Sequence, residues 1–69
     1  MKVGDVVQHK QQKDYVGTIV RAGEDLVNDK LAVLYEVAWK GSPFQIPIQY
    51  RGEWGEAIGY LFDDLVVLP

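Results

Sequence analysis

The sequence contains no cysteine, so neither a disulfide framework nor a thiolate zinc site can stabilise the chain. It has one histidine, His9, and a histidine-based metal centre or a serine triad would have to be built around that side chain. No catalytic, metal-binding or phosphate-binding motif rises above chance. We therefore expect a non-enzymatic protein without a cofactor or a bound metal, in which His9 lies on the surface of a strand.

Long apolar runs and an excess of positive charge are also missing. No run is long enough for a signal peptide or a membrane helix, so a soluble cytoplasmic protein is expected. Seven Lys and Arg against ten Asp and Glu give a net charge of −3, which repels a phosphate backbone. Nucleic-acid binding would need a local basic patch, for which Lys10, Lys13 and Arg21 are the candidates.

The chain is also short. Its 69 residues leave room for only one domain, 1–69. A chain of this size removes only about 60% of its unfolded surface on folding, which is near the limit for a domain without disulfides or metals. Its apolar content of 48% must therefore supply a core, with self-association as a further source of stability.

The stretch LAVLYEVAW, residues 31–39, alternates with a period of two. One side of it carries Leu31, Val33, Tyr35, Val37 and Trp39. This apolar side, rich in β-branched and aromatic residues, predicts a central strand whose odd-numbered face builds the core. Residues at helical spacing, followed by a Gly-Ser-Pro stop signal, make a helix the alternative, but the alternation favours the strand.

The preceding residues predict two further strands. We expect a short strand within residues 2–10, an exposed loop over 10–14 and a second strand over 15–22. Gly17 inside the second strand pattern indicates a bulge or a close backbone approach.

The connection between the second and third strands contains Asn28-Asp29, a pair that favours a tight reversal. These two strands should therefore pair antiparallel. Leu26 and Val27 fit either a packed connection or the tip of an extended hairpin, and the sequence does not decide between them.

The residues after 40 are harder to interpret. Pro47 excludes a central strand, so an edge strand or an irregular excursion is expected over 44–50. A turn at Arg51-Gly52 and a strand from Trp54 to about Ile58 should follow.

The tail predicts a helical turn over 61–64 and a last strand over 65–68. Because this strand is apolar throughout, it should be buried or paired on both sides. Asp63-Asp64 could supply paired carboxylates for acid-base chemistry, but adjacent side chains point apart, and a capping role explains them better.

This order of features resembles the small SH3-like barrel. The resemblance is carried by VGDVV at 3–7, YVGTIV at 15–20, YEVAW at 35–39 and YLFDDLVVL at 60–68. It spans most of the chain and implies an all-β, five-stranded SH3-like barrel with a short 3-10 turn before the last strand. It indicates a fold more than an activity.

Two functional families of such barrels are similar in part. Type II dihydrofolate reductases are similar in the GDVV start, in the pattern Tyr15-x-Gly17-x-Ile19-Val20 and in the spacing of Tyr60 and Leu65. Their Gln-Ile-Tyr triplet lines a tetramer pore and holds cofactor and folate, but the matching positions here are Ile58, Gly59 and Tyr60, which argues against reductase activity. Hemimethylated-DNA-binding barrels are similar in VVQHK and YVGTIV, without the rest of their pattern.

The chain has two tryptophans, four tyrosines and two phenylalanines, more than a small barrel core needs. SH3-like barrels often display such residues in a groove that grips proline-rich or methylated peptides. The candidate binding residues are Tyr35, Trp39, Phe44, Tyr50, Trp54 and Tyr60.

The leading hypothesis is therefore a non-enzymatic binding or assembly module that contacts a protein partner or a copy of itself through residues 44–60. A nucleic-acid-associated barrel and an oligomeric pore enzyme are the second and third hypotheses.

Overall fold

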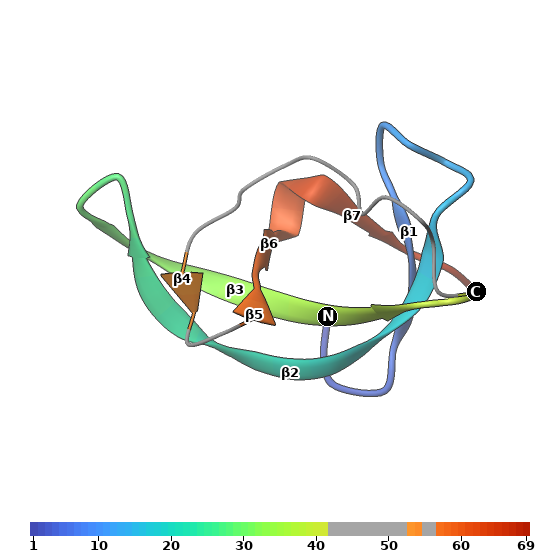
Figure 1. The fold of residues 1–69 in the computed structure, drawn as a ribbon, viewed down its shortest axis with the longest axis horizontal. Coiled ribbons are helices and arrows are strands. Elements are labelled where there is room, and N and C mark those ends of the chain that lie inside the picture. Colours follow the sequence, from blue (N-terminus) through green and yellow to red (C-terminus); the bar gives the residue numbers. More distant parts are fainter. Residues whose placement is uncertain (42–52, 55–56) are drawn as a thin grey trace.

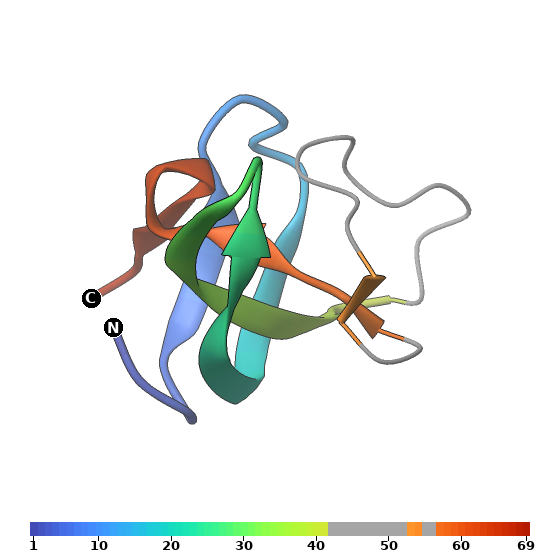
Figure 2. The ribbon, with the colours of Figure 1, turned by 90° about the vertical axis from the view of Figure 1, so that its left-hand side faces the viewer.

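The computed structural model describes residues 1–41, 53–54 and 57–69, and its main element is a five-stranded antiparallel sheet (Figures 1 and 2). The sheet has the strand order β6-β3-β2-β1-β7. Its strands are β1 (Val6–His9), β2 (Val16–Val27), β3 (Lys30–Trp39), β6 (Tyr60–Leu61) and β7 (Leu65–Val67). Within the described residues, no strand pairing joins β6 to β7, so the sheet is not closed. The all-β prediction is thus confirmed.

Strand β3 occupies the stretch LAVLYEVAW, so the strand prediction is confirmed and the helical alternative is wrong. It pairs with β2 from Gly17↔Trp39 to Val27↔Lys30 and with β6 at Tyr35↔Tyr60. Strand β3 is therefore central, as its apolar face predicted.

Strand β2 is longer than expected, because it runs on through Leu26 and Val27 to the turn. Those two residues form the extended tip of a β2–β3 hairpin, which Figure 1 shows projecting beyond the other strands. Asn28 and Asp29 make the predicted reversal with φ values of 50° and 63°. Two consecutive left-handed residues are the requirement of the two-residue turns that fit the twist of paired strands.

The left-handed φ of Asp29 leads to a stability prediction. Because an L residue other than glycine pays a steric cost in this region, Asp29→Gly should raise the free energy of unfolding by about 0.5–1 kcal/mol. Urea denaturation of the Gly and Ala variants checks this expectation. Equal stability of the two variants would contradict it, since only glycine relieves the strain.

Strand β2 contains both a bulge and a close backbone approach, but at different residues. The bulge lies between Ile19 and Arg21, where Val20 is the extra residue opposite β3. Gly17 provides the close approach instead, because a Cβ there would lie 2.5 Å from the carbonyl oxygen of Ala38.

The core forms where the inner faces of the strands meet. It consists of Val7, Ile19, Tyr35, Tyr60 and Leu65, with Met1, Val37, Trp39 and Ile58 packed against it. The odd-numbered face of β3 builds this core only from Tyr35 onward, whereas Leu31 and Val33 are 67% and 43% exposed. Leu34, on the even-numbered face, is fully buried beside Gly59. The prediction of a uniform core face is therefore wrong at the hairpin end.

The 3-10 turn η1 (Phe62–Asp64) precedes β7, as expected. Asp64 accepts a hydrogen bond from the Leu61 amide at 2.8 Å, so the capping interpretation is confirmed for this residue. Strand β7 lies at the edge of the sheet and pairs with β1. Val66 and Val67 are each 44% exposed, so the expectation of burial or pairing on both sides is wrong.

A second, two-stranded sheet replaces the single strand expected from Trp54 to Ile58. Strand β4 (Glu53–Trp54) pairs antiparallel with β5 (Ala57–Ile58). The predictions for 44–50 and Arg51-Gly52 lie outside the described residues.

Candidate functional site

The candidate binding aromatics do not form an open groove in the described residues. Tyr35 and Tyr60 are core residues, exposed by 7% and 2%, and Trp39 is half-buried against them. Trp54 lies in β4 but its side chain is outside the described part, as are Phe44 and Tyr50. Tyr35 and Tyr60 therefore serve packing rather than surface recognition.

Trp39 is the centre of a cluster of aromatic rings that packs against the core. Its ring meets Tyr60 edge-on at a centroid distance of 5.3 Å and Tyr15 at 5.9 Å. The Trp39 Nε1–H donates to the Tyr60 hydroxyl at 3.3 Å. This pair satisfies the indole donor inside the core, as buried tryptophans usually require.

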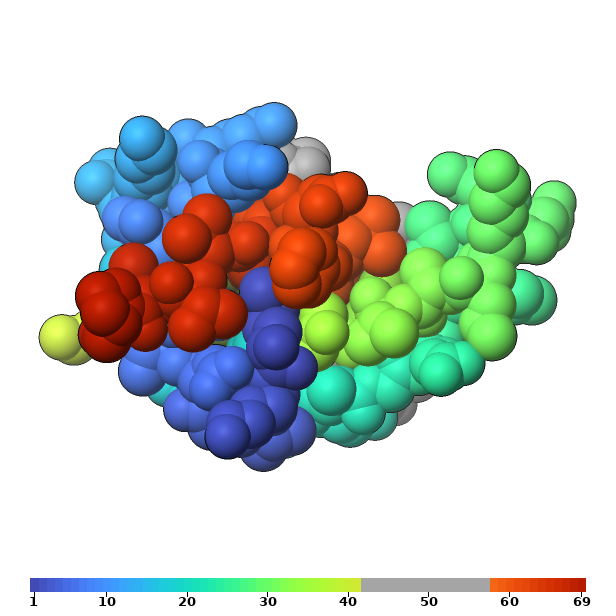
Figure 3. Space-filling view, turned by 180° about the vertical axis from the view of Figure 1, so that it is seen from behind, coloured from blue at the N-terminus to red at the C-terminus, as the bar shows by residue number. Residues whose placement is uncertain are grey.

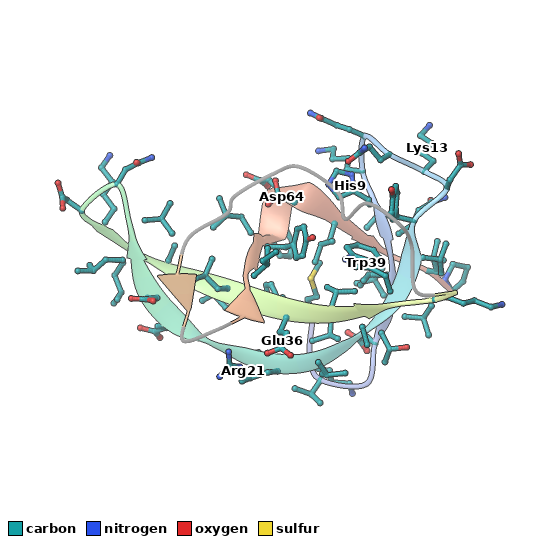
Figure 4. All side chains as sticks on the ribbon, in the orientation of Figure 1. His9, Lys13, Arg21, Glu36, Trp39 and Asp64 are labelled. Atoms are coloured by element: carbon teal, nitrogen blue, oxygen red, sulfur yellow. The ribbon has the colours of Figure 1, made fainter. Side chains whose placement is uncertain are left out.

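His9 belongs to the same cluster and is fully buried, so the prediction of a surface histidine is wrong. Alternation along β1 turns Val7 and His9 to the inside, where the His9 ring lies 6.2 Å from the rings of Trp39 and Tyr60. Its Nδ1 accepts hydrogen bonds from the backbone amides of Gln11 and Gln12 at 3.2 and 2.9 Å. The imidazole thus anchors the β1–β2 loop (Figure 4).

The hydrogen bonds define the protonation of His9. Since Nδ1 accepts, the ring proton of the neutral form lies on Nε2, which is buried without a hydrogen-bond partner among the described residues. Burial lowers the pKa of His9, and the Asp64 carboxylate opposes this shift. No three His, Cys, Asp or Glu side chains are grouped for a metal in residues 1–41, 53–54 and 57–69. The geometry suits a structural histidine.

The basic candidates do not gather into one patch. Lys10 and Lys13 are exposed around the β1–β2 loop, whereas Arg21 in β2 forms an ion pair with Glu36 at 3.1 Å. Figure 4 shows Lys13 and Arg21 on opposite sides of the molecule. Among the described residues, these three side chains give a phosphate backbone no continuous positive surface.

The most distinctive surface is apolar and lies along the β2–β3 hairpin. Leu26 pairs with Leu31 and Glu24 with Val33, so alternation places these side chains on the same face as Tyr35. Phe62 begins η1 directly after β6, the strand that pairs with β3 at Leu34↔Leu61. We call the surface formed by Leu26, Leu31, Val33 and Phe62 the apolar ledge.

All four residues of the apolar ledge are large and well exposed. The exposed fractions are 59% for Leu26, 67% for Leu31, 43% for Val33 and 61% for Phe62. Figure 3 shows the green hairpin and the orange residues around position 60 on one face, with β3 between them. The sequence did not predict this surface, because the alternation assigned Leu31 and Val33 to the core and left Leu26 undecided. The available signal was the continuation of the alternating pattern to the turn.

Acidic side chains border the apolar ledge. Glu24 lies on its face beside Leu26, Asp29 lies in the hairpin turn, and Asp63 follows Phe62 in η1. All three are exposed. The ledge therefore combines apolar contact area with a negative rim.

A second surface feature lies on the other side of the sheet. It is an open groove lined by Val6, Val16, Gly17, Thr18, Ala38 and Lys40. Its lining is largely aliphatic and has one charged side chain, Lys40.

Comparisons with known proteins return no match. No protein-family model, curated protein or solved structure matches it. In the described part of the chain, no helix has the length and apolar character needed to cross a bilayer.

Proposed function

We propose that the protein is a non-enzymatic SH3-like barrel that binds another protein through the apolar ledge. The observation that carries this proposal is the exposure of three large apolar side chains on one face of the β2–β3 hairpin, together with that of Phe62 after the neighbouring strand β6. The barrel assignment is supported by the strand order and by the 3-10 turn before the last strand. A cytoplasmic location stays a prediction.

The exposed leucines have a physical reason to be covered. Removing an aliphatic or aromatic side chain of this size from water contributes about 1.5–3 kcal/mol, and contiguous exposed apolar patches mark interaction sites. The paired strands hold Leu26 and Leu31 in a fixed arrangement, so little conformational entropy is lost when a partner covers them.

The acidic rim favours a different protein over a second copy. In a two-fold contact between ledges the same patch faces itself, so the carboxylates of Glu24, Asp29 and Asp63 on one copy would lie near those of the other copy. Like charges brought together at an interface oppose association. We therefore assign the ledge to a heterologous partner.

Selection of random displayed peptides against the chain tests the proposal. Peptides recovered should shift the amide NMR signals of the apolar ledge, and the double variant Leu31→Ser/Val33→Ser should lose at least about tenfold in affinity, since two apolar contacts are removed. Selected peptides whose shifts map to other surfaces would refute the proposal.

A matched variant controls for loss of fold. Val6→Ser/Val20→Ser removes two valines that are 44% and 47% exposed and lie outside the ledge. It should retain peptide binding, because neither side chain belongs to the ledge face. Equal losses in both double variants would show that the effect is not specific to the ledge.

A further inference from the structure

We infer that the partner of the apolar ledge is a basic apolar segment, in which leucine- or valine-type residues are bracketed by Lys or Arg. This inference rests on the proposed function and adds the chemical class of the partner. It follows from where the acidic residues lie relative to the exposed apolar side chains.

The ledge face of the β2–β3 hairpin presents a carboxylate and no cationic side chain. Side chains alternate along each strand, so Glu24 and Leu26 share the ledge face, whereas Asp25 and Val27 lie on the other side. On β3, Lys30 alternates with Leu31 and is likewise turned away from the ledge face. The charge that the paired strands present beside Leu26, Leu31 and Val33 is therefore a carboxylate.

Two further carboxylates lie at the hairpin turn and in η1. Asp29 occupies the hairpin turn beyond Leu31, and Asp63 follows Phe62 in η1. Negative charge thus occurs at the turn, at Glu24 opposite Val33, and next to Phe62. Arg21, the nearest arginine along β2, is engaged with Glu36 on the opposite face.

The acidic rim is complementary to positive charge on a bound segment. A segment that covers the leucines brings its flanking residues to the rim, within the Debye length of about 8 Å at physiological salt. Lys or Arg at these positions gains attraction to the three carboxylates, whereas Glu or Asp would be repelled. The apolar side chains supply affinity, and the rim selects the sign of the flanking charge.

Three synthetic peptides test the inference. Each has a central Leu-Val-Leu run, and the flanking positions carry two lysines, two glutamines or two glutamates on each side. We expect the lysine peptide to bind the ledge about tenfold more tightly than the glutamine peptide, measured by amide NMR titration, and the glutamate peptide to bind least. In 1 M salt the difference between the peptides should largely vanish.

A charge-neutralised variant makes the test specific to the rim. Glu24→Gln/Asp63→Asn should weaken the lysine peptide severalfold and leave the glutamine peptide unchanged. The control Asp14→Asn removes an exposed carboxylate from the β1–β2 loop and should change neither affinity.

The outcomes separate this inference from the proposed function. If all three peptides shift the amide signals of the ledge and bind with equal affinity, the inference of a basic partner is wrong but the ledge is still the binding site. If none of them shifts the ledge, both are wrong. A dimer detected by sedimentation, and dissociated by Leu31→Ser/Val33→Ser, would assign the ledge to a second copy and overturn the basic partner.

Discussion

Gly17→Ala should lower the free energy of unfolding by about 3 kcal/mol, at the upper end of the cost of overpacking. The added Cβ would lie 2.5 Å from the Ala38 carbonyl oxygen and 2.7 Å from Val37 Cγ1. The first of these atoms belongs to the backbone of β3, which can move only if the Gly17↔Trp39 pairing is disturbed. Urea denaturation followed by tryptophan fluorescence measures the loss.

The size of this effect matters because the whole domain is small. At about 0.05–0.15 kcal/mol per residue, a chain of this length has a total stability of roughly 3–10 kcal/mol. The loss is therefore a large part of the total stability, and partial unfolding of the alanine variant in buffer without urea is also consistent with the prediction.

Gly59→Ala is the matched control. Its Cβ would meet side-chain atoms of Leu34, the nearest at 3.1 Å, and a side chain can shift more cheaply than a backbone. The cost should therefore be clearly smaller than at Gly17. A greater loss at Gly59 than at Gly17 would contradict the close approach of β2 and β3.

The second large effect is a loss of stability in mild acid that depends on His9. Burial lowers the pKa of this imidazole below its ordinary value of 6.5, with the Asp64 carboxylate opposing the shift. Protonation would place a charge in the core and turn Nδ1 from an acceptor into a donor. The two hydrogen bonds from the Gln11 and Gln12 amides would then be lost.

The sign follows from the lowered pKa. The unfolded chain binds the proton more readily than the folded one, so the contribution of His9 is complete above pH 6.5 and is lost as the pH falls from 6.5 towards the folded pKa. The slope in this window is at most about 1.4 kcal/mol per pH unit for a single proton. Denaturation at intervals between pH 8 and pH 5 measures it.

The variant His9→Asn isolates this contribution. Asparagine Oδ1 can accept the loop amides in place of Nδ1 but does not titrate, so the variant should be less stable at pH 8 and lack the histidine-dependent slope. Asp64→Asn should extend the loss to lower pH, since the opposing carboxylate is gone. Identical slopes in the wild-type and His9→Asn proteins would refute a titrating core histidine.

Much of the fold could be predicted because its signals are local. The alternation of Leu31–Trp39 and the turn pair Asn28-Asp29 predicted a strand and a reversal, and both are present. Gly17 predicted a bulge or a close approach, and the structure has the close approach at this residue.

The errors arose where burial depends on remote segments. His9 has the sequence context of an exposed strand residue, yet β3 and β6 bring Trp39 and Tyr60 over it. The converse holds for Leu31 and Val33, which look like core residues but lie beyond the strands that cover Tyr35.

The sequence by itself determined β1, β2, β3 and β7, the Asn28-Asp29 turn and which side chains of these strands share a face, because backbone alternation and φ preferences act over a few residues. Only the tertiary structure decided which part of a face is covered. The same apolar side of β3 enters the core at Tyr35 and reaches solvent at Leu31, since β6 ends its pairing at Leu34. The candidate site exists because the β2–β3 hairpin extends beyond β6, the strand that pairs with β3 at Leu34 and Tyr35.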